Sequence, residues 1–153
     1  MPSELMIADE KRTAAVDYLK RWIGTPYIYG GDDFSGMDCN GIMHEVLQGL
    51  GIEVRGYDAT AHGMWFDYMD KEVAKGYAGC LVFWFRANGV VQHVAMMIDN
   101  ARIVHAAGGT GDTLTEKDAI RQNAYIRMDD FGEYSKYRGQ EYKICDPFLV
   151  RSN

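Results

Sequence analysis

One segment decides how this chain is organised: Gly24-Thr25-Pro26-Tyr27-Ile28-Tyr29-Gly30-Gly31-Asp32-Asp33-Phe34-Ser35-Gly36-Met37-Asp38-Cys39-Asn40-Gly41. It is typical of a helix end, a glycine-rich turn region and the start of a new helix at residues 38–41. A cysteine in the first turn of a helix lies at the positive end of the helix dipole, which lowers a thiol pKa and favours the thiolate. Cys39 is therefore a candidate nucleophile, and the rest of the chain has to supply the groups around it.

Length and composition indicate one globular domain. The chain has 153 residues, of which 47% are hydrophobic and 12% aromatic. This size is common for a single domain, so we expect one domain over residues 1–153. The formal net charge of -6 and the lack of a basic run argue against binding to a nucleic-acid backbone.

The termini and the cysteines exclude other classes of protein. Residues 1–4 carry no basic segment and residues 5–8 are too short for the apolar core of a signal peptide, so we expect a chain that is cytoplasmic when made. No apolar run reaches the roughly 18 residues of a membrane span. Cys39, Cys80 and Cys145 contain no Cys-x-x-Cys pair, which disfavours both a disulfide framework and a local zinc site. We expect no cofactor and no metal.

Apolar periodicity predicts helices first and strands afterwards. The predicted helices cover Ala8–Ile23, with Asp9 as N-cap, then Cys39–Leu50 and Ala59–Val73. The predicted strands are residues 80–85, 90–98, 102–106, 125–128 and 142–145, and a short helix capped by Thr115 is expected before residue 123. This order indicates an α+β fold in which the N-terminal helices pack on a mostly antiparallel sheet of about five strands.

Two histidines flank one turn of the predicted sheet. If residues 99–101 form a three-residue loop, Ile98 pairs with Arg102, and His93 and His105 become diagonal neighbours on one face. One histidine then contacts the thiol of Cys39, and the other bonds to its far ring nitrogen and fixes the tautomer. A two-residue loop would place the two histidines on opposite faces and remove this arrangement.

These residues also allow interpretations other than catalysis, most of them structural. The histidine face is otherwise apolar: Val91, Ala95, Met97 and Ile103. Histidines on such a face are more often core residues than catalytic ones. His44 and His62, within predicted helices, are expected to be surface or structural residues, and Cys80 and Cys145 to be inert buried thiols. A zinc site built from the candidate cysteine and the histidine pair is a further alternative.

Three separated pieces of the sequence resemble the NlpC/P60 family of papain-like cysteine peptidases. Residues 24–31 are similar to its glycine-x-proline-tyrosine-x-aromatic-glycine-glycine segment, and Asp38-Cys39-Asn40-Gly41 resembles its Asp-Cys-Ser-Gly motif. Residues 81–83, 93–95 and 105–106 resemble its sheet with the histidine base and the polar third residue. The resemblance covers about residues 8–107 and implies a papain-like fold.

The resemblance implies a role for each matching residue. Cys39 would be the nucleophile, His93 the general base and His105 the residue that orients His93. Tyr27 would lie beside the nucleophile and help to bind the reacting carbonyl, and Asp38 would contribute to substrate recognition. The implied reaction is hydrolysis of bacterial cell-wall (murein) stem peptides, typically at the bond between γ-D-glutamate and a diamino acid.

Two residues depart from the family pattern, and one segment of the motifs suggests a phage origin. Asn40 replaces the usual serine, and Cys80 stands where the family usually has aspartate. Residues 29–39 look most like phage- or prophage-encoded members, so phage tail proteins are expected partners besides the stem peptides, and a virion or the cell wall is an expected destination. The alternatives are a non-catalytic module of a phage tail or wall complex, and an amidase or acyl transferase that uses the same triad.

Overall fold

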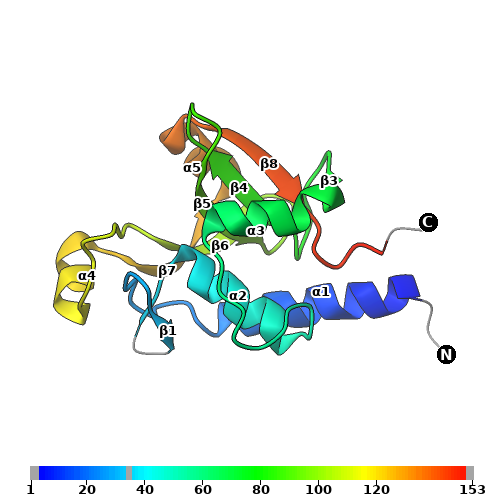
Figure 1. Cartoon of the computed structure of the whole chain (residues 1–153), viewed down its shortest axis with the longest axis horizontal. Coiled ribbons are helices and arrows are strands. Elements are labelled where there is room, and N and C mark those ends of the chain that lie inside the picture. The colour runs from blue at the N-terminus through cyan, green and yellow to red at the C-terminus, as the bar shows by residue number, and fades with distance from the viewer. Residues whose placement is uncertain (1–3, 34–35, 151–153) are drawn as a thin grey trace.

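The chain folds as an α+β protein around one antiparallel sheet. A computed structural model describes residues 4–33 and 36–150. The main sheet has six strands in the order β3-β8-β4-β5-β6-β7 (Figure 1). Their bounds are Glu72–Val73 (β3), Leu81–Phe85 (β4), Val91–Met97 (β5), Arg102–Ala107 (β6), Tyr125–Asp130 (β7) and Glu141–Cys145 (β8). The expected fold class is confirmed, with one strand more than predicted.

Five α-helices accompany the sheet. They are Glu4–Lys20 (α1), Cys39–Gly49 (α2), Ala61–Tyr68 (α3), Glu116–Gln122 (α4) and Phe131–Arg138 (α5), as far as the described residues show. A separate hairpin pairs Asp32–Asp33 (β1) with Gly36–Met37 (β2). The turn predicted at residues 32–36 has its tip, Phe34 and Ser35, outside the described residues. No described helix is long and apolar enough to cross a membrane.

The boundaries of helices α1 and α3 differ from the prediction. The first helix begins at Glu4, so Asp9 lies inside it and forms an ion pair with Arg12 instead of capping the end. The third helix ends at Tyr68 rather than Val73. Met69–Lys71 form one 3-10 turn, and the backbone of the next two residues pairs with β8, which makes β3 the sixth strand. A two-residue strand depends on its partner and gives no periodic signal of its own.

Helices cover the two faces of the sheet unequally. Helices α1, α2 and α3 pack on one face, where Leu19, Ile42 and Met64 meet Phe83 and Val94. Helix α5 covers the other face. The residues buried under α5 include Val82, Trp84, Ala95, Met97, Ile103 and Tyr134. Both faces of β4 and β5 are therefore buried, which explains why these strands are almost continuously apolar.

A bulge between β4 and β5 changes which face one valine occupies. Trp84 pairs with His93, but the next residue, Phe85, pairs with Val91. Gln92 is passed over, so the alternation of the strand breaks there. Val91 packs with the cluster under α1–α3, and the prediction that it shares the histidine face is wrong.

A buried ion pair ties α1 to the segment after β8. Asp146 has no solvent exposure. Its Oδ2 accepts hydrogen bonds from Nε of Arg12 at 3.0 Å, from Nη2 of Arg12 at 2.6 Å and from the hydroxyl of Tyr77 at 2.6 Å. Removing one partner of such a pair leaves an uncompensated buried charge, which is strongly destabilising.

Asp146→Ala is therefore expected to lower the free energy of unfolding by about 3 kcal/mol. Asp9→Ala removes the other carboxylate on Arg12, but the Asp9 side chain is 69% exposed. We expect this control to cost less than about 1 kcal/mol. Urea denaturation followed by circular dichroism measures both, and equal losses in the two variants would contradict the assignment.

Candidate active site

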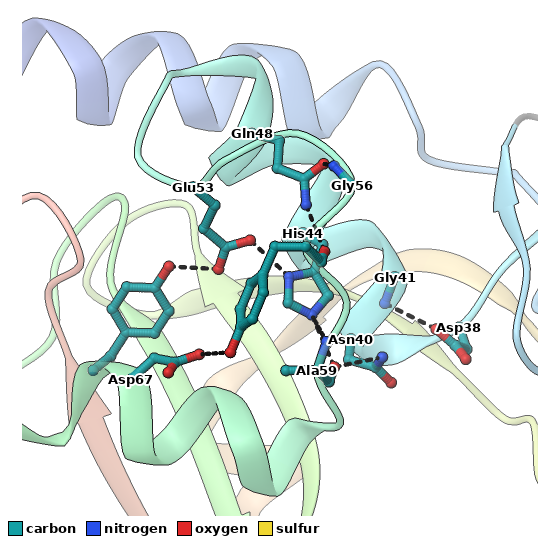
Figure 2. A network of polar contacts seen from close by, with 11 residues as sticks. Asp38, Asn40, Gly41, His44, Gln48, Glu53, Gly56, Ala59 and Asp67 are labelled. Carbon is teal, nitrogen blue, oxygen red and sulfur yellow. Dashed lines mark hydrogen bonds and ion pairs between the residues drawn. The ribbon is translucent and has the colours of Figure 1, made fainter.

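The carboxylate of Asp38 joins the glycine-rich segment to the start of α2. Its Oδ1 accepts the backbone N–H of Gly41 at 2.8 Å, which caps the helix, and its Oδ2 accepts the N–H of Gly30 at 2.8 Å. Figure 2 shows the first of these bonds. A Cβ on Gly41 would lie 2.7 Å from both Asp38 Oδ1 and the carbonyl oxygen of Gly31. The glycine of the Asp-Cys-Asn-Gly motif is thus required by this close packing.

Cys39 is the first residue of α2, and its thiol is almost completely buried. Burial raises the pKa of Cys39 to about 11, and the nearby carboxylate of Asp38 acts in the same direction. Backbone N–H groups of Val94 and Asn40 oppose this shift without overcoming it. The expectation that the helix start favours a thiolate is wrong for the resting protein, because desolvation outweighs the helix terminus. The thiol needs a base.

His93 and His105 lie on one face of the sheet, as a three-residue loop at residues 99–101 predicts. In the β5–β6 ladder Met96 pairs with Val104, and the backbone N–H of Ile98 donates to the carbonyl of Arg102. The three-residue loop is confirmed, and the two imidazoles meet on the face under α5. Nε2 of His93 lies 2.7 Å from Nδ1 of His105.

The histidine pair continues to a carboxylate that the sequence did not reveal. Nε2 of His105 lies 2.7 Å from Oδ2 of Asp129 on β7. Arg127 donates from Nε to the same oxygen at 3.3 Å. The predicted strand stopped at Met128, one residue short of Asp129. Only the pairing of β6 with β7, in which Ile103 faces Asp129, could have pointed to it.

Helix α5 closes over the histidines. The ring of Tyr134 lies 4.5 Å from that of His105 and 5.6 Å from that of His93, between ring centroids. Nη1 of Arg138 donates to the Tyr134 hydroxyl at 3.0 Å. Burial lowers the pKa of His93 well below its ordinary value, and His105, Arg138 and Arg127 add to the effect. His93 is therefore neutral at pH 7 and able to accept a proton.

A cleft of about 1100 Å³ brings most of the predicted site together. Tyr27, Asp38, Cys39 and His93 all line it. His105 does not line the cleft; it is fully buried behind His93. The hydrogen bond from the backbone of Val94 to the Cys39 thiol places the cysteine beside the strand that carries His93.

Tyr27 packs between Cys39 and the loop after β6. Burial raises the pKa of Tyr27, and the charges of Cys39 and Asp38 reinforce the shift, so its hydroxyl stays protonated. A Cβ on Gly109 would lie 2.0 Å from Cδ1 of the Tyr27 ring. The loop can therefore approach the ring only because residue 109 is glycine.

Residues 55–60 form another wall of the cleft, and His44 holds the loop that contains them (Figure 2). Nδ1 of His44 lies 2.7 Å from Oε1 of Glu53, and Nε2 lies 2.8 Å from the carbonyl oxygen of Ala59. Burial opposes the charged imidazole, but Glu53 and Ala59 outweigh it and raise the pKa of His44. His44 was expected to be a surface or structural residue, and the structure gives it the structural role.

The same wall gives Asn40 a contact. Its Nδ2 donates to the carbonyl of Ala59 at 3.0 Å, so the residue that replaces the family serine tethers the wall to α2 (Figure 2). His62 also has a structural contact, because its Nδ1 accepts the backbone N–H of Val91 at 3.0 Å. Cys80 and Cys145 are fully buried, as expected of inert thiols. Over residues 4–33 and 36–150, no group of three or more acidic, histidine or cysteine side chains is placed to hold a metal ion.

Comparison with known proteins decides the family. The model of the NlpC/P60 family matches residues 24–129, which include the whole histidine, cysteine and Asp129 arrangement. The chain belongs to the NlpC/P60 family. The expectation drawn from the sequence motifs is thereby confirmed at the level of the family.

The curated relatives of this NlpC/P60 chain are larger proteins. It is 32% identical over 89 residues to a γ-D-glutamyl-L-lysine dipeptidyl-peptidase from Bacillus cereus, a match that covers 57% of this chain and 26% of that protein. The chain spans 16% to 54% of the length of the curated relatives it matches.

Solved structures share the fold at low identity. A NlpC/P60 family protein from Bacillus cereus has a TM-score of 0.70 and 19% identity, over 90% of this chain and 40% of that one. The peptidoglycan hydrolase RipB from Mycobacterium tuberculosis has a TM-score of 0.70 and 16% identity, over 98% of this chain and 70% of that one.

The contact between Gly109 and Tyr27 can be tested by a matched pair in one loop. Gly109→Ala is expected to lower the free energy of unfolding by about 1–3 kcal/mol, because the added methyl group displaces the Tyr27 ring. A Cβ on Gly111 meets nothing within 4 Å, so Gly111→Ala should stay within about 0.5 kcal/mol. Denaturant unfolding measures both, and an unchanged Gly109→Ala variant would overturn the contact.

Proposed function

We propose that this chain is a cysteine endopeptidase of the NlpC/P60 type that hydrolyses bacterial cell-wall stem peptides. The observation that carries the proposal is the meeting of Cys39 and His93 in one cleft, with His105 and Asp129 behind the imidazole. A nucleophile, a base and an orienting group in this order are what acyl transfer requires.

In the proposed reaction His93 takes the proton of the Cys39 thiol as the sulfur attacks the peptide carbonyl. The new carbon–sulfur bond gives a tetrahedral oxyanion. The backbone N–H of Cys39 at the start of α2 is a suitable donor to this oxygen, and the protonated Tyr27 hydroxyl is a second. The imidazolium then gives its proton to the leaving amine, and water attacks the acyl-enzyme with His93 again as base.

The scissile bond we propose joins γ-D-glutamate to the diamino acid that follows it. The name of the 32% identical relative from Bacillus cereus, a γ-D-glutamyl-L-lysine dipeptidyl-peptidase, supports this choice. The role of Asp38 in substrate recognition belongs to the same proposal. Its carboxylate lines the cleft although it also caps α2. A phage origin, phage tail partners and the cellular location of the chain stay predictions from the sequence.

Replacing the nucleophile tests the proposed reaction directly. Cys39→Ala is expected to reduce cleavage of a defined L-Ala-γ-D-Glu-diamino acid muropeptide by at least about a thousandfold. The matched control is Cys80→Ala, which removes a buried thiol outside the cleft and should retain activity. Mass spectrometry of the products identifies the bond that is broken.

The outcome separates the competing functions. Full cleavage by the Cys39→Ala variant would overturn the assignment of Cys39 as the nucleophile. A wild-type chain that cleaves no muropeptide would favour the non-catalytic module. Acyl transfer to an added amine, in place of hydrolysis, would favour a transferase.

The acidity of His93 predicts how the activity depends on pH. Since burial lowers its pKa below the ordinary value of 6.5, the neutral base persists as the pH falls through 6.5 and is lost only at lower pH. The acid limb of kcat/KM should therefore have its midpoint below pH 6.5. Circular dichroism at each pH separates this limb from acid unfolding, and a midpoint at or above 6.5 would contradict the buried environment.

A further inference from the structure

We propose that Asp129 is a positioning residue of the active site, which acts through His105 to leave Nδ1 of His93 as the unprotonated nitrogen. The inference rests on the proposed function, since it concerns the base of that reaction. It assigns a task to a residue that no sequence motif marks, and it commits to one ring nitrogen of His93.

The proton arrangement follows from Asp129 outward. The hydrogen bond from His105 lowers the pKa of Asp129. Burial opposes this shift, and the charges of His105 and Arg127 reinforce it, so Asp129 is a carboxylate at neutral pH. A carboxylate only accepts hydrogen bonds. Nε2 of His105, 2.7 Å away, must therefore carry a proton and donate it to Oδ2.

The next hydrogen bond transmits this choice to His93. Burial lowers the pKa of His105 although Asp129 opposes the shift, so the ring is neutral and has one proton. With that proton on Nε2, Nδ1 of His105 has a lone pair and accepts a bond. Nε2 of His93, 2.7 Å away, is then the donor. A neutral His93 with its proton on Nε2 keeps a lone pair on Nδ1, the nitrogen not engaged by His105.

The reverse arrangement would disable the base. If Nδ1 of His105 carried the proton, it would donate to Nε2 of His93 and force the His93 proton onto Nδ1. The nitrogen left for the Cys39 thiol would then be a donor and unable to take a proton. Asp129 excludes this arrangement because its oxygen needs the proton on the far nitrogen of His105.

The surroundings keep this chain of bonds in place. The side chain of His105 is fully buried, and that of Asp129 is 34% exposed. Arg127 holds the same oxygen of Asp129, and Tyr134 covers both imidazoles. The charged and titratable groups around the two histidines come from four elements. They are Cys39 on α2, which lines the same cleft as His93, His105 on β6, Arg127 and Asp129 on β7, and Tyr134 and Arg138 on α5.

Nuclear magnetic resonance of the ring nitrogens tests the proton arrangement without any substrate. In the full chain labelled with ¹⁵N-histidine at pH 7, we expect Nδ1 of His93 to be unprotonated and Nε2 of His105 to be protonated. Asp129→Asn should give a mixture of arrangements, because the amide offers either a donor or an acceptor to His105. A His93 proton on Nδ1 in the unmodified chain would overturn the proposal.

Kinetics test the consequence for the reaction. Asp129→Asn is expected to lower kcat by at least about tenfold with KM changed less than about twofold. The acid limb should move to lower pH. A carboxylate near the two histidines favours the charged imidazole of His93, and its loss makes His93 a weaker base. Asp129→Glu should restore part of the rate. The control is Asp118→Asn, which removes a partly buried carboxylate, 22% exposed and paired with Arg121 on α4, and should leave kcat and the acid limb unchanged.

The possible results separate this inference from the proposed function. A purely structural Asp129 would lower the melting temperature without moving the acid limb or the ring nitrogens, and this result would overturn the proposal. If the unmodified chain cleaves no wall peptide, the proposed substrate fails, while the nitrogen assignment in that same chain still decides the role of Asp129.

Discussion

The pairing of β5 with β6 is the constraint on which the rest of the site depends. Because side chains alternate along a strand, a slip of one residue would send one histidine to the opposite face of the sheet. Asp99 prevents such a slip: its Oδ1 accepts the backbone N–H groups of Ala101 at 2.9 Å and Arg102 at 2.7 Å, which fixes the three-residue loop. The contact between His93 and His105 therefore begins with one carboxylate in an exposed turn.

Burial decides the electrostatics of the site. It raises the pKa of Cys39 and lowers that of His93, so desolvation favours the neutral thiol and the neutral imidazole. In such a pair the thiol proton moves to the imidazole as the sulfur attacks. The reaction then depends on the groups that decide which ring nitrogen of His93 is free to accept this proton. Within the part of the chain that the structure describes, Asp129 is the charged group that hydrogen-bonds to His105, on the side away from His93. The helix start beneath Cys39 serves chiefly as a rigid mount and as a source of backbone donors.

Much of the fold was accessible from local patterns. Helix α2, its start at Cys39, the cap at Thr115 and the β5–β6 loop all followed from residues close together in the sequence. Helix α5 was missed because one residue of it, Tyr134, is buried and its cap signals, Asp130 and Gly139, enclose no apolar stripe. Strand β3 was missed because two residues carry no alternation.

The sequence by itself determined the nucleophile candidate, the histidine pair and the family, since each depends on residue types at short, fixed spacings. Tertiary structure alone decided the ionisation of Cys39, the place of Asp129 and the covering of the histidines by Tyr134. Desolvation depends on every segment that packs around a group, and a contact between β6 and β7 depends on a register set across 24 residues of chain. Local spacing contains neither quantity, so these properties appear only when the chain has folded.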